Sequence, residues 1–210
     1  MFGITLAKAI NSKNETLLGK IIYIDPGHGG KDNGASYGGV LEDEINLKIS
    51  GYIIEQLIDY GAYVLTSRTN DYDLSNIYDK NKKRSDLINR VKQINNSRVD
   101  IFVSIHLNSY PSESINGAQV FYQDNDDSKV LAENIQNSLN VITNNSKKVK
   151  YGDYYILNKS IQTGVIVECG FLSNTIERDK LVQGEYQKKI AKKIVQGIIG
   201  YFAYVEIAKL

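Results

Sequence analysis

The sequence predicts an α/β fold, a single domain in which helices cover both faces of a sheet of about six strands. Short apolar runs rich in β-branched and aromatic residues alternate with longer segments of helical period, which is typical of this class. No internal repeat, proline-rich linker or change in composition divides the chain. With 210 residues, of which 42% are hydrophobic, the chain can bury roughly 70% of its extended surface around one core.

The predicted strands are mostly continuous apolar runs, as expected for strands that are covered on both faces. They span residues 20–25, 62–67, 100–106, 118–123, 154–157 and 164–168.

Apolar stripes at four-residue spacing predict the helices that lie against this sheet. A shorter helix is predicted over residues 86–95, and the polar segments 70–86 and 144–153 are expected to be surface loops. The basic residues Lys80, Lys82, Lys83 and Arg84 are interpreted as a solvated face. The stripes are Ile45, Ile49, Ile53 and Leu57; Leu131, Ile135 and Leu139; and Ile190, Ile194 and Ile198.

Charge and motifs argue against several function classes. The 25 basic and 24 acidic residues give a net charge of +1, so no overall field favours a nucleic-acid partner. The glycine-rich segment 27–35 lacks the spacing of a nucleotide-binding loop, and its glycines instead predict a sharp turn and close backbone approach. No G-x-S-x-G elbow is present, and Cys169 is expected to be a small buried hydrophobe.

The chain carries no run close to the ~20 apolar residues that cross a bilayer. Its first 14 residues hold an apolar stretch that is too short, and too interrupted by lysine, for the core of a secretion signal. A chain that had lost a native leader or membrane anchor would look the same. The compartment is therefore inferred from the substrate.

Two histidines, His28 and His106, each follow directly on a predicted strand. In open α/β sheets, reacting groups gather at the carboxyl ends of the strands, so we expect both imidazoles to converge there. Each histidine taken separately is more often a satisfied hydrogen-bonding group than a ligand. Together with one carboxylate, however, they form a standard ligand set for a catalytic zinc ion with one open position.

Five carboxylates close to His28 are candidates for the third ligand: Asp25, Asp32, Glu42, Asp43 and Glu44. We choose Glu42, because it opens a predicted helix and can point back over the strand end. The alternative is that Glu42 and its two acidic neighbours only stabilise the helix N-terminus, at roughly 0.3 to 1 kcal/mol each.

Glu168 is a second carboxylate of interest, since it ends an apolar strand, where burial of an unpaired charge is unfavourable. Beside a metal ion it can act as a general acid and base. Alternatively, it accepts hydrogen bonds from the loop that follows. Position alone does not decide between these roles.

Three motifs resemble, in order and spacing, the zinc-dependent N-acetylmuramoyl-L-alanine amidases of the amidase-3 type, which are bacterial cell-wall hydrolases. They are DPGHGGKDNGASYGGVLEDEINLKIS, VDIFVSIHLNS and GVIVECGFLSN, within a match from about Lys20 to Phe202. The resemblance implies a mixed, mostly parallel sheet, with zinc held by His28, Glu42 and His106 and with Glu168 as catalytic carboxylate. It implies a catalytic domain over residues 20–205, preceded by an N-terminal extension over residues 1–19.

Within that family, the run KKRSDLINRVKQINNSRVDIFVSIHLNS looks like the sporulation-specific amidases of the spore cortex. This resemblance implies cleavage of the amide bond between N-acetylmuramic acid and L-alanine of the stem peptide. A peptidoglycan deacetylase then acts on the product as a step toward muramic-δ-lactam. It also implies an extracytoplasmic location, in the cell wall or spore cortex, and leaves room for an accessory or activating protein.

Three further residues are candidates around this centre. Asn108 and Arg90 are expected to contact substrate or to scaffold the site, and Asp25 to orient a loop or His28. Other function classes stay open on the residues alone: a zinc deacetylase or carboxypeptidase of the cell wall, a non-catalytic peptidoglycan-binding module and, more weakly, an iron oxygenase.

Overall fold

The structure is a computed structural model that describes residues 15–210. Residues 1–14 of the predicted N-terminal extension lie outside the described residues. The following residues 16–19 form a turn, and Leu17 within it is fully buried in the core. The packed part of the chain therefore begins a few residues before Lys20.

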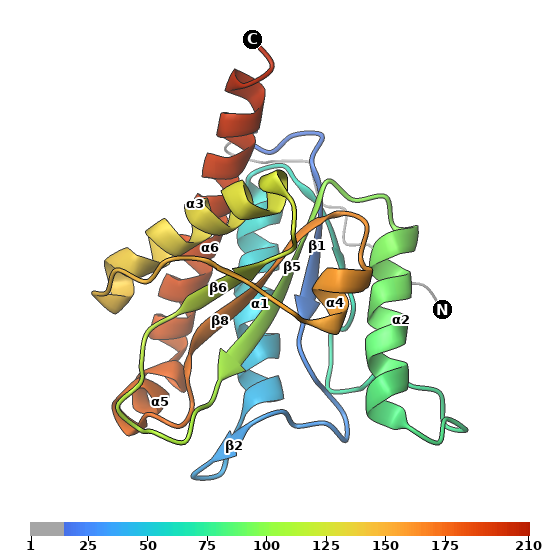
Figure 1. The fold of residues 1–210 in the computed structure, drawn as a ribbon, viewed down its shortest axis with the longest axis vertical. Coiled ribbons are helices and arrows are strands. Elements are labelled where there is room, and N and C mark those ends of the chain that lie inside the picture. The colour runs from blue at the N-terminus through green and yellow to red at the C-terminus, as the bar shows by residue number, and fades with distance from the viewer. Residues whose placement is uncertain (1–14) are drawn as a thin grey trace.

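Six strands form the central sheet, in the order β4-β1-β5-β8-β6-β7 (Figure 1). The strands β4, β1, β5 and β8 run parallel, β6 pairs antiparallel with β8, and β7 pairs parallel with β6. The predicted mixed, mostly parallel sheet is confirmed. The bounds are Ile21–Pro26 for β1, Tyr63–Thr66 for β4, Ile101–Asn108 for β5, Gln119–Tyr122 for β6, Lys150–Tyr151 for β7 and Thr163–Phe171 for β8.

Helices cover both faces of this sheet, as predicted. The helices α2 and α4 lie on the near side in Figure 1, whereas α1 lies on the far side. The side chains of α1, α3 and α6 share one large apolar cluster with the sheet, and those of α2 and α4 share a smaller one. The bounds are Glu42–Asp59 for α1, Lys82–Asn96 for α2, Asp126–Thr143 for α3, Tyr155–Lys159 for α4, Thr175–Leu181 for α5 and Gly184–Ile207 for α6.

The alternation of side chains along β5 decides which face carries the chemistry. Ile101, Val103 and Ile105 pack into the large cluster, whereas Phe102 packs into the cluster under α2 and α4. Because side chains two residues apart share a face, His106 points to the same side as Phe102. The residues after β1 lead into a short hairpin of β2 (Ser36–Tyr37) and β3 (Val40–Leu41), which runs directly into α1.

The predicted strand at residues 154–157 is wrong, because this segment forms the first part of α4. Ile156 and Leu157 are both buried, and adjacent inward side chains do not fit the alternation of a half-buried strand. An apolar run of four residues is too short for periodicity to separate helix from strand. The sixth strand is β7, inside the segment that was expected to be a loop.

The loop predicted over residues 70–86 ends earlier than expected, because α2 begins at Lys82. The side chain of Asn81 accepts a hydrogen bond from the backbone N–H of Arg84 and caps the helix N-terminus. Across residues 15–210, no helix combines the length and the apolar character needed to cross a bilayer.

Candidate metal centre

His28 lies in the turn after β1 and has a left-handed backbone conformation, with φ at 59°. Its Nδ1 atom lies 3.0 Å from Oδ2 of Asp32, which fixes the ring, and its Nε2 atom lies 3.3 Å from Oε1 of Glu42. Burial opposes protonation of the ring, but the Glu42 and Asp32 carboxylates outweigh it and raise the pKa of His28 to about 9.

His106 lies near the carboxyl end of β5, and its ring packs directly on the backbone of Gly27. A Cβ atom at position 27 would lie 2.2 Å from Cε1 of His106, so only glycine leaves room for the ring. This close approach is the role that the sequence predicted for the glycine-rich turn. The Nδ1 atom of His106 lies 3.0 Å from Oε1 of Glu42.

Glu42 is the first residue of α1 and is buried between the two rings. Its Oε1 accepts a hydrogen bond from the backbone N–H of Leu107 at 3.0 Å, and its Oε2 accepts one from that of Ala35 at 2.8 Å. Burial alone would raise the pKa of Glu42, but the two histidines outweigh it and hold the pKa well below its usual range. The side chain is therefore ionised and held in place.

The nitrogen and oxygen atoms that His28, Glu42 and His106 offer all lie within 4.8 Å of one another. The predicted convergence of the two imidazoles is confirmed. Two imidazoles and one carboxylate are the donor set of catalytic zinc sites. The raised pKa of His28 reflects the negative charges of Glu42 and Asp32 beside it, and the lowered pKa of Glu42 keeps this carboxylate ionised, so the residues present fit a divalent cation.

The other four carboxylates considered as ligands are not part of this three-residue cluster. Asp32 holds the far side of the His28 ring, a role that the sequence analysis missed although it placed this residue nearby. Glu44 is exposed and pairs with Lys48 at 4.0 Å. Asp43 lies beside Glu42 in the first turn of α1, and Asp25 belongs to a different buried network.

Glu168 stands beside His106 in the sheet, since the two residues are partners in the β5–β8 register. Its side chain is buried, and Oε2 has no hydrogen-bond partner among the described residues. Burial raises the pKa of Glu168 to about 7, although the positive field of His106 opposes this. Tyr154, which the sequence analysis did not single out, has its pKa raised to about 12 by burial and by the Glu168 charge.

Asp25 is fully buried, and it is Asp32, not Asp25, that bonds Nδ1 of the His28 ring. It accepts hydrogen bonds from Ser67 Oγ at 2.6 Å, Ser104 Oγ at 2.7 Å and Arg90 Nη1 at 2.6 Å. Arg90 in turn donates from Nη2 to the carbonyl of His28 at 2.5 Å. Asp25 thus reaches the His28 turn through Arg90.

Arg90 is only 2% exposed, and its guanidinium donates to Asp25, to Asp86 and to the carbonyls of Pro26 and His28. These contacts match the scaffolding alternative of the sequence analysis. Asn108 is the last residue of β5 and is half-buried, two positions beyond His106. Its substrate contact stays a prediction.

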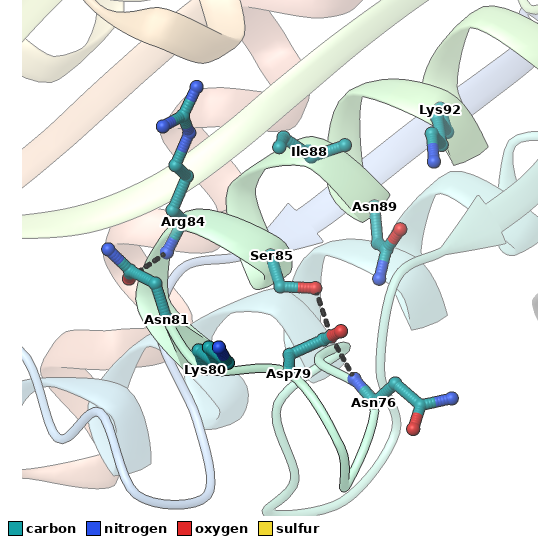
Figure 2. Close-up of a pocket in the computed structure, with 9 residues that line it drawn as sticks. All are labelled: Asn76, Asp79, Lys80, Asn81, Arg84, Ser85, Ile88, Asn89 and Lys92. Atoms are coloured by element: carbon teal, nitrogen blue, oxygen red, sulfur yellow. Dashed lines mark hydrogen bonds between the residues drawn. The ribbon is translucent and has the colours of Figure 1, made fainter.

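The basic segment before and within α2 borders an open pocket that lies apart from the three converging side chains (Figure 2). Ser85 and the backbone N–H of Asn76 both donate to the carboxylate of Asp79, which orders the loop. Lys80, Lys83 and Arg84 are exposed, as the predicted solvated face requires, whereas Lys82 is half-buried. Lys83 also pairs with Asp32, the carboxylate beside the His28 ring, at 3.6 Å.

Residues 22–200 match the protein family described as N-acetylmuramoyl-L-alanine amidase. The chain belongs to this family. The amidase is 37% identical over 194 residues to the germination-specific N-acetylmuramoyl-L-alanine amidase of Bacillus subtilis strain 168. That match covers 89% of this chain and 81% of the relative. The predicted enzyme class is confirmed, and its substrate is peptidoglycan.

Solved structures of amidases share this fold. The CwlD amidase from Clostridioides difficile, in complex with the GerS lipoprotein, superimposes with a TM-score of 0.85 at 37% identity, covering 88% of this chain and 99% of that one. The catalytic domain of the amidase CwlV from Bacillus (Paenibacillus) polymyxa superimposes with a TM-score of 0.78 at 29% identity, covering 88% and 98%.

Proposed function

We propose that this amidase hydrolyses the bond between N-acetylmuramic acid and L-alanine with a zinc ion held by His28, Glu42 and His106. Glu168 serves as the general acid and base. The observation that carries the proposal is the convergence of the three ligand atoms within 4.8 Å, beside a buried Glu168 oxygen without a partner.

When held by these three residues, zinc would supply a Lewis acid that activates water for attack on the amide. Oε2 of Glu168 takes up the proton of the attacking water and delivers it to the L-alanine nitrogen as the carbon–nitrogen bond breaks. Asp32 keeps the His28 ring in its binding orientation. In this proposal Asn108, at the end of β5, contacts the substrate. The products are the free stem peptide and a glycan strand with unsubstituted muramic acid.

The substrate proposed is spore-cortex peptidoglycan, on the basis of the 37% identity to a germination-specific amidase. A deacetylase would then act on the unsubstituted muramic acid, toward muramic-δ-lactam. An accessory protein is proposed because the similar CwlD amidase was solved with a lipoprotein. Such a substrate places the catalytic domain, residues 20–205, in the cell wall or spore cortex, outside the cytoplasm.

The test compares wild type, Glu168→Gln and His106→Ala on cortex-type and vegetative peptidoglycan. Mass spectrometry identifies the products, and metal analysis counts zinc in each protein. We expect wild type to release stem peptide with one zinc per chain, preferentially from cortex-type material. Glu168→Gln keeps the zinc but loses at least about 100-fold in rate, since a general acid and base typically contributes that much. His106→Ala loses zinc and activity together.

Each alternative has its own signature in this experiment. Release of acetate or of a single amino acid would identify a deacetylase or a carboxypeptidase. Binding without any product would identify a non-catalytic module. Unchanged turnover of Glu168→Gln would remove this residue from the mechanism, and equal rates on both substrates would remove the cortex preference.

A further inference from the structure

The turn that carries His28 points three successive backbone carbonyls at buried guanidinium groups. These are the carbonyls of Pro26, Gly27 and His28. His28 itself has a positive φ of 59°, which residues other than glycine seldom adopt. Such a conformation persists only where the surrounding structure fixes it.

Arg68 donates four hydrogen bonds to backbone carbonyls around this turn. Its Nε donates to the carbonyl of Pro26 at 3.1 Å, and its Nη1 to that of Asn70 at 3.2 Å. Its Nη2 donates both to the carbonyl of Gly27 at 3.0 Å and to that of Asp43 at 2.7 Å.

The two hydrogen bonds of Nη2 link the two chain segments that carry the proposed ligands His28 and Glu42. Gly27 directly precedes His28, and Asp43 directly follows Glu42. This nitrogen atom therefore links the turn after β1 to the first turn of α1, alongside the Asn46 amide of α1, which donates to the same Gly27 carbonyl at 3.3 Å. The side chain also lies against the backbone beyond His28, since a Cβ at Gly29 would be 3.1 Å from Nε of Arg68.

This arrangement places a charge in an unfavourable position. Arg68 is 1% exposed, and no carboxylate oxygen of residues 15–210 lies within 4.0 Å of its guanidinium nitrogens. Burial, followed by the charge of neighbouring Arg90, lowers the pKa of Arg68 and outweighs the opposing charges of Asp25, Asp43 and Asp71. Arg90, by contrast, is compensated by ion pairs with Asp25 and Asp86 at 2.6 and 2.7 Å. A buried guanidinium whose hydrogen bonds all go to backbone carbonyls, and whose pKa is lowered despite nearby carboxylates, is poorly explained by stability alone.

We propose that Arg68 is a positioning residue of the metal centre, which fixes the distance between His28 and Glu42 by bridging the carbonyls of Gly27 and Asp43. The inference rests on the zinc centre proposed above. Arginine is required because a planar fork reaches four carbonyls at once, whereas the single ammonium of lysine cannot.

The test measures the zinc affinity of Arg68→Lys and Arg68→Met by competition with a chromogenic chelator. Unfolding of the metal-free proteins by urea is followed in parallel. We expect both variants to stay folded without metal and to bind zinc about 10- to 100-fold more weakly, the usual loss when a group that orients metal ligands is changed.

Arg178→Lys is the matched control, because Arg178 also donates to a backbone carbonyl, that of Leu172 at 2.6 Å, away from the three ligands. Its zinc affinity should equal that of wild type. Affinity at the wild-type level in Arg68→Lys, an equal loss in Arg178→Lys, or unfolding of either metal-free Arg68 variant would each overturn the inference. Failure of wild type to bind zinc would instead refute the proposed metal centre.

Discussion

Asp25 is a buried carboxylate whose charge is stabilised by two hydroxyl groups and one guanidinium. Burial alone would raise its pKa, but Arg90, followed by Ser67 and Ser104, outweighs burial and lowers it. Through Arg90 this carboxylate supports the turn that carries His28. It therefore contributes both to stability and to the shape of the candidate centre.

Replacement of Asp25 by Asn should destabilise the metal-free protein by about 3–5 kcal/mol at neutral pH, because it leaves the buried Arg90 charge poorly compensated. The stabilisation that a lowered pKa provides is present above the unfolded value of about 3.9 and is lost as the pH falls through the folded value. The difference in unfolding free energy between wild type and Asp25→Asn should therefore shrink below about pH 4.

Urea unfolding at a series of pH values, with a chelator present, measures this difference. The exposed pair of Glu185 with Lys188 supplies a control, since Glu185→Gln should change stability little at any pH. A difference for Asp25→Asn that stayed constant down to pH 2 would contradict the assignment.

At the scale of elements, the sequence predicted the long helices because their apolar stripes recur over two to three turns. The sequence did not predict α4, which has only five residues. Its helical conformation depends on the packing of Ile156 and Leu157 into the smaller apolar cluster. The hairpin of β2 and β3 and the two-residue β7 were also missed. Elements this short are decided by tertiary contacts rather than by their own pattern.

Two glycines inside long helices should respond in opposite directions to replacement by alanine. A Cβ at Gly51 in α1 meets nothing within 4 Å, so Gly51→Ala should stabilise the protein by about 0.5–1 kcal/mol. A Cβ at Gly197 in α6 would lie 2.5 Å from Cα of Ile135 in α3. Gly197→Ala should therefore destabilise it by about 1–3 kcal/mol.

Urea unfolding of the two single variants checks both signs, and each variant is the control of the other. Equal stabilisation by both substitutions would show that α3 and α6 do not approach each other as closely as the structure describes.

At the scale of the whole molecule, the strand order creates the candidate centre. The strands β1, β5 and β8 are adjacent and parallel, so their carboxyl ends lie at one edge of the sheet. His28 follows the first of these, His106 lies near the end of the second, and Glu168 lies on the third. Glu42 completes the set from the start of α1.

Because the three proposed ligands come from separate elements, zinc should stabilise the whole fold rather than one segment. At a free zinc concentration of 100 times the dissociation constant, the free energy of unfolding should rise by about 2.7 kcal/mol. For a chain of this size that corresponds to roughly 5–10 °C in the melting temperature. Thermal unfolding at buffered zinc concentrations measures the shift.

His106→Ala should show no such shift, since it lacks one ligand. A melting temperature of the wild-type protein that did not respond to zinc, or a shift of equal size in His106→Ala, would count against the three-ligand centre.

The sequence by itself determined the α/β class and the stripes of the long helices, because these follow from the local spacing of apolar residues. It also indicated His28, Glu42, His106 and Glu168 as candidates, because each stands at the end of a predicted strand or at the start of a predicted helix. The tertiary structure alone decided the contacts of Asp32 with the His28 ring, of Arg68 with the carbonyls of Gly27 and Asp43, and of Arg90 with Asp25. Such contacts join side chains to backbone groups through turns and neighbouring strands, and no periodic pattern in the chain records which carbonyl a buried guanidinium will meet.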